Sequence, residues 1–527
     1  MIDRGFFRFM TGLVVATVFA WTLPAFSANY PLELVSPRAA GTAPAVGNAS
    51  ISQTHRVFKA YPGLEYNIRA VVVGGAYPYQ FALTNAPSGM TIDENTGLIV
   101  WENPQQNASP TLIVTDSEGA SASSTWTIDV TSSGFKFVDA IRGGSYPAGT
   151  GTIDNPWRNL SDLINASSAT AGDIVYFRTG VYNAEGIPRG SVGSAWERIE
   201  FSTHRNKPVA WIAYPGEAPV IDFGFRSGID PGVLIRFAGP NIYVDGFEAR
   251  NTRVIGFQLS DGEGSNYAVF RQLKMHDLNM VRANLEGTNA SLIMTTSAYS
   301  NSNTGGNAST WSQYPAIQDC EFYNAPVDLA IKTYSLWKSL IEDNVFHDLN
   351  YGIEIKADMP QFTYRGNTHY GSPGRAIGGN MHSFTTHGEI LFNLVNEPSG
   401  QFALDVNQDS QAKRIDIYRN TFIGRVRVRS VDSSDGPFRL YNNVVVNNDS
   451  GTGSAPHIYL EEISDPSRII VSNNITGYPG DNIVDSSGAL TSAYSEYVTT
   501  HGSEMRTGGG LITAAPSHPG NVSVEPQ

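Results

Sequence analysis

The sequence is poor in cysteine, in charge and in long apolar runs. Of its 527 residues, only Cys320 is a cysteine, which excludes an intrachain disulfide and any metal site built from several cysteines. Charged residues make up 16% of the chain, against about a quarter in ordinary proteins, and this scarcity argues against a helical bundle or a coiled coil. The chain instead contains 52 glycines and 29 prolines, a composition typical of short strands separated by turns.

The few charges are also unbalanced. Lysine and arginine total 35 and are outnumbered by 49 aspartates and glutamates, so the formal net charge is −14. We therefore do not expect nucleic acid as a partner, because phosphate binding needs a basic field.

The N-terminal segment has the pattern of an export signal. Arg4 and Arg8 precede the apolar stretch Phe9–Leu23, and small residues follow it. A positive start, an apolar centre and a small-residue cleavage site predict a signal peptide over residues 1–27. The apolar stretch is short for a membrane span, and no later stretch approaches that length. We expect a secreted or periplasmic bacterial protein with no membrane span in the mature chain.

Residues 46–133 alternate between short strands and Gly/Pro turns, which predicts a small β-sandwich. The phrase GGAYPYQF, continued by APSGMTIDENTGLIVW, resembles the immunoglobulin-like and cadherin-like modules of bacterial secreted proteins. Such modules usually serve as spacers, and carbohydrate binding is the alternative. A Thr-Ser-Ser-Gly linker at residues 131–134 ends this domain.

One short helix is predicted at residues 154–164. Asp154 or Asn155 can cap it, and Pro156 suits its first position. Its apolar residues share one face, which consists of Trp157, Leu160, Leu163 and Ile164. A helix followed by the strand series from residue 171 resembles the start of secreted right-handed β-helix proteins, in which the helix covers the open end of the first coil.

A 24-residue repeat is the strongest organisational signal. Asp319–Asn324 aligns with Asp343–Asp348 (343 − 319 = 24), and Leu329–Lys332 aligns with Ile353–Lys356 (356 − 332 = 24). Asparagines recur in similar settings at Asn344, Asn367, Asn393, Asn420, Asn443 and Asn474. One three-strand coil per repeat predicts a right-handed parallel β-helix over residues 135–500, followed by a tail at 501–527. Stacked asparagines would form an amide ladder from coil to coil.

The register of the repeat predicts which side chains leave the solenoid. Alternation turns the apolar residues inward, and these are Leu329, Ile331, Ile353, Ile355, Phe402, Leu404, Val406, Val426, Val428, Ile458 and Leu460. The outward set includes Lys332, Glu354, Lys356, Asp358, Asp405, Asn407, Arg425, Arg427, Arg429, Tyr459 and Glu461. Coils stack about 4.8 Å apart, so these residues form one dense polar face. Lys332 is expected directly above Lys356, an arrangement from which a purely structural face gains nothing.

A groove of this composition suits a linear acidic polysaccharide. β-Elimination of a uronide needs a group that neutralises the carboxylate, a base for the C5 proton and an acid for the oxygen at C4. Lys356 is the candidate base, and Arg375, His382, His387 and Arg427 on the following coils are candidates for the acid or the neutraliser. The candidates for substrate binding are Lys332, Asp405, Arg427 and Tyr459.

A calcium site is a further possibility on this face. Ca²⁺ takes carboxylate oxygens, and Glu354 and Asp358 are the candidate ligands, although no EF-hand spacing is present. Calcium is therefore an optional cofactor in this prediction.

The segment Glu354-Ile355-Lys356-Ala357-Asp358, with Tyr364-Arg365-Gly366-Asn367-Thr368-His369, resembles polysaccharide lyase family six, the β-helix alginate lyases and chondroitinase B. The resemblance implies that Lys356 is the base. In that family an Arg-His-Gly strand on the next coil supplies the acid. Here Gly379 stands near the expected arginine, and Arg375 comes earlier in the strand. The similarity spans about 60 residues.

Two other classes of protein remain open. A β-helix glycoside hydrolase needs two carboxylates about 5 to 9 Å apart, and Glu354, Asp358 and Asp405 are available. The polygalacturonase motifs are missing, however, and an epimerase stays in the same group of alternatives. A non-catalytic adhesin or glycan-binding solenoid is the third class. The sequence predicts an exported, monomeric lyase whose partner is an acidic polysaccharide.

Overall fold

The computed structural model describes the chain between residues 28 and 512 with gaps. The described ranges are 28–44, 49–184, 190–191, 196–224, 232–252, 254–260, 264–278, 290–296, 311–356, 358–380, 386–397, 400–407, 413–432, 436–446, 458–477, 484–485, 507–508 and 511–512. The predicted signal peptide, the candidate His382 and most of the predicted tail lie outside these residues. No helix in the described ranges is long and apolar enough to cross a membrane.

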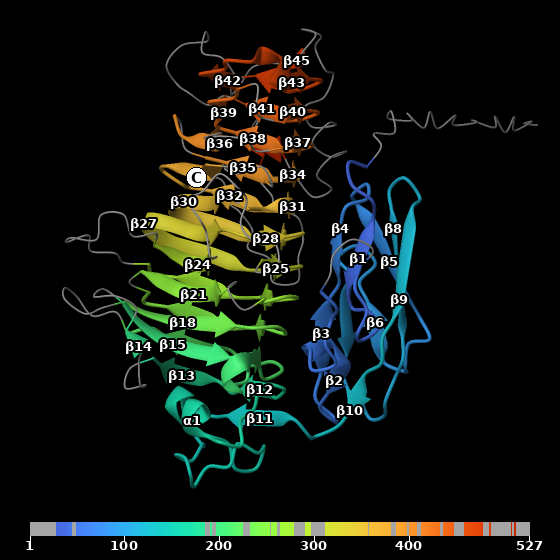
Figure 1. Ribbon diagram of the computed structural model, residues 1–527, viewed down its shortest axis with the longest axis vertical. Helices are drawn as coiled ribbons and strands as arrows, with labels where there is room; N and C mark the ends of the chain where they lie inside the picture. The colour runs from blue at the N-terminus through green and yellow to red at the C-terminus, as the bar shows by residue number, and fades with distance from the viewer. Residues whose placement is uncertain are drawn as a thin grey trace, which may run out of the picture.

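Three stacks of parallel strands form the larger domain, which rises as a column of coils in Figure 1. The first stack is a 12-stranded sheet of β11 (Phe135–Val138), β12 (Ile174–Phe177), β16 (Ala210–Ala213), β19 (Tyr243–Asp245), β22 (Val269–Arg271), β26 (Ala316–Gln318), β29 (Leu340–Glu342), β31 (Pro360–Arg365), β34 (His387–Leu391), β37 (Ile415–Tyr418), β40 (Phe438–Tyr441) and β43 (Ile469–Ser472).

The second and third stacks are joined into one sheet, because two long strands, β27 (Glu321–Thr333) and β30 (Val345–Ile355), run through both. The second stack also contains β13 (Gly180–Asn183), β17 (Pro219–Asp222), β20 (Glu248–Arg250), β23 (Lys274–His276), β32 (Thr368–Tyr370), β35 (Leu394–Asn396), β38 (Thr421–Ile423), β41 (Val444–Val446) and β44 (Ile475–Gly477). The third contains β15 (Trp196–Ser202), β18 (Gly232–Ala238), β21 (Ile255–Ser260), β24 (Ser291–Thr296), β33 (Arg375–Asn380), β36 (Phe402–Asn407), β39 (Arg425–Arg429) and β42 (Ile458–Glu461).

Short elements complete this domain. Strand pairs outside the stacks or at their margins are β14 (Gly190–Ser191) with β15, β25 (Ser312–Gln313) with β28 (Leu336–Trp337), β44 with β45 (Val484–Asp485), and β46 (Thr507–Gly508) with β47 (Leu511–Ile512). Single 3₁₀ turns stand at η2 (Thr203–Arg205) and η4 (Pro466–Arg468), and a third, η1 (Arg56–Phe58), lies in the N-terminal domain.

The predicted asparagine ladder is confirmed at one corner of the coils. Each side-chain amide donates to the carbonyl oxygen of the next, at 2.9 Å from Asn344 to Asn367 and 3.0 Å from Asn367 to Asn393, and the series continues to Asn474. The residue before each ladder asparagine has a positive φ, such as 57° at Asp343 and 68° at Gly366. This left-handed residue makes the tight bend that brings one asparagine over the next.

The helix at the lower end is shorter than predicted. It is α1 (Leu160–Asn165), and its N-cap is Asn159, not Asp154 or Asn155. Asn159 and Asp162 form a capping box, in which each side chain accepts from the other residue's backbone N–H. Trp157 precedes the helix, although it is buried in the same core as Leu160 and Leu163, so the predicted apolar face is right.

The N-terminal domain is a β-sandwich, as predicted, and begins earlier than residue 46. Its strands are β1 (Glu33–Ser36) with β4 (Val71–Val73), β2 (Lys59–Ala60) with β10 (Asp129–Val130), β3 (Tyr66–Arg69) with β7 (Leu98–Trp101) and β6 (Met90–Ile92), and β5 (Tyr79–Thr84) with β8 (Thr111–Asp116) and β9 (Ser121–Thr125). Leu34 and Val35 of β1 belong to the apolar core of this domain, so the strand is part of it.

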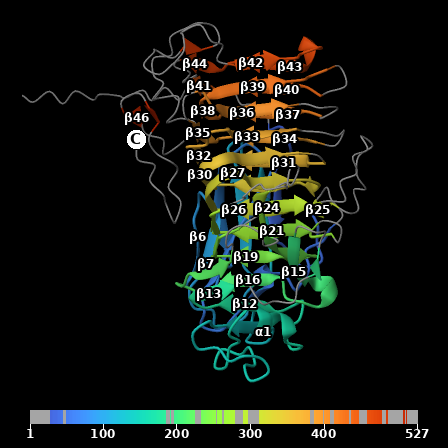
Figure 2. The same ribbon diagram turned by 90° about the vertical axis from the view of Figure 1, so that its left-hand side faces the viewer.

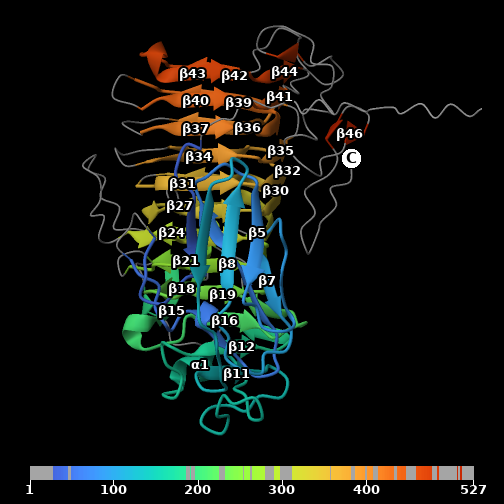
Figure 3. The ribbon, with the colours of Figure 1, turned by 90° about the vertical axis from the view of Figure 1, so that its right-hand side faces the viewer.

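The N-terminal domain packs along the outer face of the 12-stranded sheet, as Figure 3 shows. One apolar cluster contains both domain-core residues and outward residues of the sheet, such as Tyr176, Tyr243 and Leu340. The domain therefore docks on the coils, because aromatic residues of the sheet's outer face have their contact surface in it. Its role as a spacer or as a carbohydrate-binding module stays a prediction.

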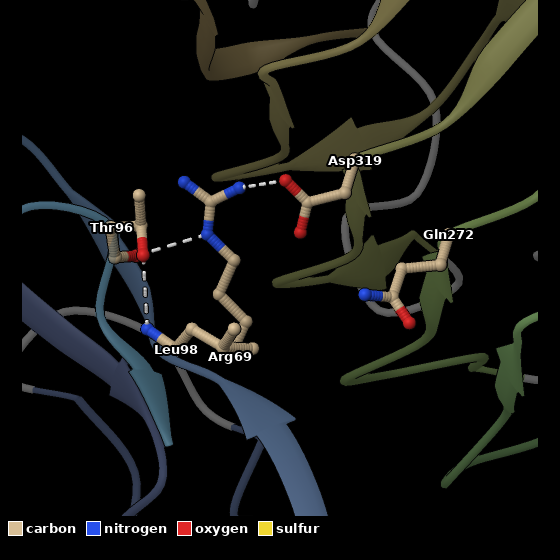
Figure 4. Close-up of a pocket in the computed structure, with 5 residues that line it drawn as sticks. All are labelled: Arg69, Thr96, Leu98, Gln272 and Asp319. Atoms are coloured by element: carbon tan, nitrogen blue, oxygen red, sulfur yellow. Dashed lines mark hydrogen bonds and ion pairs between the residues drawn. The ribbon is translucent and has the colours of Figure 1, made fainter. Parts of the chain in front are cut away.

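Buried arginines add polar links between the domains. Arg69 of β3 forms ion pairs with Asp319 and Asp343 of the coils. Arg365 of β31 donates to the Tyr79 hydroxyl at 2.7 Å and to the Val72 carbonyl at 2.8 Å. A small pocket beside Arg69, seen in Figure 4, also belongs to this boundary between the domains, since Thr96 and Leu98 line it from one side and Gln272 and Asp319 from the other.

Replacing Arg69 tests whether the docking is part of the fold's stability. Arg69→Met removes the cation that Asp319 and Asp343 share, and we expect the free energy of unfolding to fall by about 3–5 kcal/mol. Urea denaturation followed by tryptophan fluorescence measures it. Arg142→Met is the control, because Arg142 is exposed; equal losses in the two variants would contradict the assignment.

Candidate functional site

Most of the predicted site residues lie on the outer face of the third stack. Strand register places Lys332, Glu354, Gly378, Asp405, Arg427 and Tyr459 in one column, each beside the next. In Figures 1 and 2 these strands stand away from the face that the N-terminal domain covers. The N-terminal domain therefore does not cover this column, and we name it the charged column.

The expected neighbour of Lys332 is wrong. Lys332 pairs in register with Glu354 (354 − 332 = 22) and not with Lys356. The cause is a register shift in β27 between Ala325 and Leu329, which removes two residues from the repeat halfway along the strand. A shift of two keeps every side chain on its predicted face and changes only its partner in the next coil.

Charges alternate along the column as a result. Glu354 lies 3.0 Å from Nζ of Lys332, and Asp405 accepts two hydrogen bonds from Arg427, at 2.9 and 3.0 Å. Opposite charges on neighbouring strands stabilise a sheet. Stabilisation of the sheet therefore explains the alternating charges in part. A function must come from the groups that lie beside these ion pairs.

The position between the two carboxylates is occupied by Gly378, and Arg375 fills the space. Arg375 extends over Gly378, with one terminal nitrogen 3.4 Å from Glu354 and the other 3.8 Å from Asp405. A Cβ on Gly378 would lie 2.5 Å from Cδ of Arg375. The absent side chain thus makes room for the arginine that completes the alternation.

Lys356 and Arg375 converge on one atom. Both contact Oε1 of Glu354, Lys356 at 3.6 Å and Arg375 at 3.4 Å, while Lys332 takes Oε2. The ring of Tyr334 lies beneath the two lysines, with its centroid 5.9 Å from Lys332 and 5.8 Å from Lys356. The side chain of Lys356 is 18% exposed, against 6% for Lys332, so Lys356 is the lysine that a molecule on the outer face would meet.

Aromatic rings support the arginines. The Arg375 guanidinium lies 5.2 Å from the ring of Tyr351, and the Arg427 guanidinium lies 4.2 Å from the ring of Phe402. Phe402 was expected inside the coil, but it is only partly buried and lies under the arginine. A register shift between Phe402 and Leu404 is the reason, because it turns Ala403 into the core instead.

The last coil carries the two remaining members of this face. Tyr459 pairs in register with Arg427, and Glu461 lies 3.3 Å from Nη1 of Arg427. Leu460 was expected inside, but it is 47% exposed. Ile458 packs against the core.

The surroundings of Glu354 do not fit a calcium ion. Burial opposes ionisation of this carboxyl, but Lys332, Lys356 and Arg375 lower its pKa below the ordinary value. Three cations therefore already neutralise it. Among the described residues, no group of three His, Cys, Asp or Glu side chains is arranged to hold a metal ion. Calcium at Glu354 and Asp358 stays a prediction, and the mechanism below uses no metal.

Sequence reasoning missed the parts that position the arginines. Gly378, Tyr334, Tyr351 and Phe402 were not candidates, because their roles depend on contacts between coils. One signal was available: a glycine in a position where neighbouring coils carry charged residues indicates room for a long side chain.

A second polar column stands on the outer face of the second stack. The rings of His276, Tyr323, His347 and Tyr370 stack one above the other, with centroids 4.5, 5.0 and 4.9 Å apart. His347 also lies 3.2 Å from Glu321 and 2.9 Å from Asp348. The charges of this column are paired within it.

Comparison with known proteins assigns only the N-terminal domain. A family model described as "Putative Ig domain" matches residues 43–131, which confirms the predicted immunoglobulin-like domain. No curated protein matches the chain.

The chain is similar to several solved structures at low sequence identity. The family 28 exopolygalacturonase of Yersinia enterocolitica is 11% identical, with a TM-score of 0.33, over 80% of this chain and 97% of that one. A Bacteroides fragilis protein described as a "putative alpha-galactosidase" is 11% identical, with a TM-score of 0.17, over 39% of this chain and 44% of that one. At these TM-scores no activity carries over, and the fold rests on the strand register described above.

Filling the space above Gly378 should displace Arg375. Because the new Cβ of Gly378→Ala meets the middle of the Arg375 side chain, we expect a loss of about 1–3 kcal/mol in the free energy of unfolding, measured by urea denaturation. Gly172→Ala is the matched control, since its nearest contact is 3.4 Å away. A variant as stable as the wild type would contradict the placement of Arg375.

The His347 column should make stability depend on pH. Burial alone would lower the pKa of His347, but hydrogen bonds with Glu321 and Asp348 outweigh it and raise the pKa above the ordinary 6.5. The stabilisation is then fully present below about pH 6.5 and is lost as the pH rises through the folded-state pKa. We expect His347→Gln to lower the melting temperature more at pH 6 than at pH 9, measured by calorimetry. An equal loss at both pH values would contradict the ion pairing.

Proposed function

We propose that the chain is an exported, monomeric enzyme that cleaves an acidic, uronic-acid-containing polysaccharide by β-elimination on the charged column. The observation that supports this most is the convergence of Lys356 and Arg375 on one oxygen of Glu354, at 3.6 and 3.4 Å. A potential base and a fixed cation are thereby held within one sugar unit of each other, on a face that the N-terminal domain leaves open.

The cations suit a polymer with a carboxylate on each sugar. Ion pairs and neighbouring aromatic rings hold the side chains of Arg375 and Arg427 in place. A guanidinium group can bind a carboxylate with two parallel hydrogen bonds. Their side chains are 16% and 20% exposed, so each retains surface for a ligand. Stacked strands repeat this arrangement along the column, as a linear polymer requires.

The reaction needs one proton to leave C5 and one to reach O4. Arg375 next to the substrate carboxylate would offset the negative charge that develops at C5. Lys356, as the free amine, would take the C5 proton; the electron pair forms the C4–C5 double bond and the C4–O bond breaks. An acid then protonates the leaving oxygen, and Arg375, His382 and the protonated Lys356 are its candidates.

The charges argue against a hydrolase on the same face. A glycosidase needs one carboxylic acid that is protonated at working pH, and the cations around Glu354 lower its pKa. Burial does raise the pKa of Glu389 to about 7 and that of Asp416 to about 6. These two groups lie on the 12-stranded sheet, however, with 2% and 0% of their surface exposed, where no polymer can contact them.

Lys356 provides the sharpest test. Lys356→Arg keeps the positive charge beside Glu354 but cannot act as a base, so we expect the turnover rate to fall by about 10²–10⁴-fold. The measurement is the ultraviolet absorbance of unsaturated products from alginate, pectate, glucuronan and glycosaminoglycans. Lys274→Arg is the matched control, because Lys274 is 62% exposed on the second stack.

Each other result of this assay has a meaning. New reducing ends without ultraviolet absorbance would show that the enzyme is a hydrolase and not a lyase. Binding without cleavage of any polymer would leave a glycan-binding protein. Full activity in Lys356→Arg would remove Lys356 from the role of the base.

A further inference from the structure

The first described residues of the chain reach past the N-terminal domain onto the later coils. The Asn29 side chain donates to the Tyr441 hydroxyl at 3.1 Å and accepts from Arg439 at 2.7 Å and from Arg414. The Tyr30 hydroxyl lies 3.0 Å from Nδ1 of His387, and the two rings stack with their centroids 5.7 Å apart. Residues in or next to β34, β37 and β40 are thereby tied to the start of the chain.

These contacts adjoin two buried carboxylates. Glu389 and Asp416 are register neighbours in β34 and β37 and are almost fully covered. Arg414 and Arg439 both form ion pairs with Asp416. The amide oxygen of Asn29 is a second acceptor for both guanidinium groups, so two cations are satisfied by one carboxylate and one amide.

The residue before Asn29 contacts the N-terminal domain. The backbone nitrogen of Ala28 lies 3.3 Å from Oε2 of Glu118, in the turn between β8 and β9. The predicted signal peptide ends at residue 27, so this nitrogen is the one that its removal would set free. Hydrolysis of the Ser27–Ala28 bond consumes one water, which supplies the hydroxyl of the Ser27 carboxyl group and one proton to the nitrogen. The resulting amine takes a second proton near neutral pH.

We propose that Ala28–Tyr30 form a latch that holds the N-terminal domain on the later coils, and that signal-peptide removal completes the latch by creating an α-ammonium group beside Glu118. The proposal rests on the proposed export and is independent of the reaction at Lys356.

The latch is tested by hydrogen exchange of the backbone amides in β34, β37 and β40, using the processed chain 28–527. Asn29→Ala removes the shared acceptor of two arginines, and a hydrogen bond to a charged group is worth enough that exchange should be faster by about 10-fold or more. Asn103→Ala is the matched control, because Asn103 is an exposed asparagine of the same domain. Unchanged exchange in Asn29→Ala would overturn the latch.

The role of signal-peptide removal needs a second comparison. Glu118→Gln should speed exchange by roughly 1.5- to 5-fold in the processed chain, as expected for an exposed ion pair. It should have a smaller effect when the Ala28 amine is acetylated, because acetylation removes the charge. Glu102 is an exposed glutamate of the same domain, and Glu102→Gln should leave the exchange rate unchanged whether the Ala28 amine is free or acetylated.

Two results would overturn this second part. One is an equal effect of Glu118→Gln with and without acetylation. The other is an N-terminus different from Ala28 in the exported protein, determined by mass spectrometry. Neither measurement involves polysaccharide cleavage, so a failure of the lyase proposal would be recognised separately.

Discussion

Parallel strands that stack in register are the constraint on which the rest of this structure depends. Backbone hydrogen bonds hold successive coils about 4.8 Å apart, so each side chain has a set neighbour above it and another below. Three kinds of column follow from this one geometry. Asparagine amides pair inside a corner, histidine and tyrosine rings stack outside the second stack, and opposite charges alternate outside the third.

Two of the three outer faces of the coils are used in different ways. The 12-stranded sheet presents tyrosines and aliphatic residues, and the N-terminal domain covers them while buried arginines join the two parts. The third stack presents charged residues, and the N-terminal domain does not cover it. A net charge of −14 therefore coexists with a surface on which lysine and arginine are gathered, because the acidic residues there are held in ion pairs. An acidic polymer would meet this local surface and not the average charge of the molecule.

The positions of the cations depend on details smaller than a coil. A glycine leaves room for Arg375, a register shift in β27 brings Glu354 rather than Lys356 to Lys332, and another in β36 places Phe402 beneath Arg427. The glycine and the shift in β27 bring Arg375 and Lys332 to Glu354, which also contacts Lys356. The shift in β36 places a ring beneath Arg427, the partner of Asp405.

Much of the fold could be predicted from the sequence alone. The recurrence of asparagines such as Asn344 and Asn367 indicated the coils and the ladder, and alternation within strands identified the face that carries Lys332, Lys356, Asp405 and Arg427. These features depend on residues that recur at a regular interval along the chain or alternate within one strand. The partners of Lys332 and Arg375, the exposure of Phe402 and the docking of the N-terminal domain were decided by the tertiary structure. They depend on bulges and on contacts between segments more than 20 residues apart. The local periodicity of the sequence does not indicate where a strand gains or loses a residue, so these contacts could not be predicted from it.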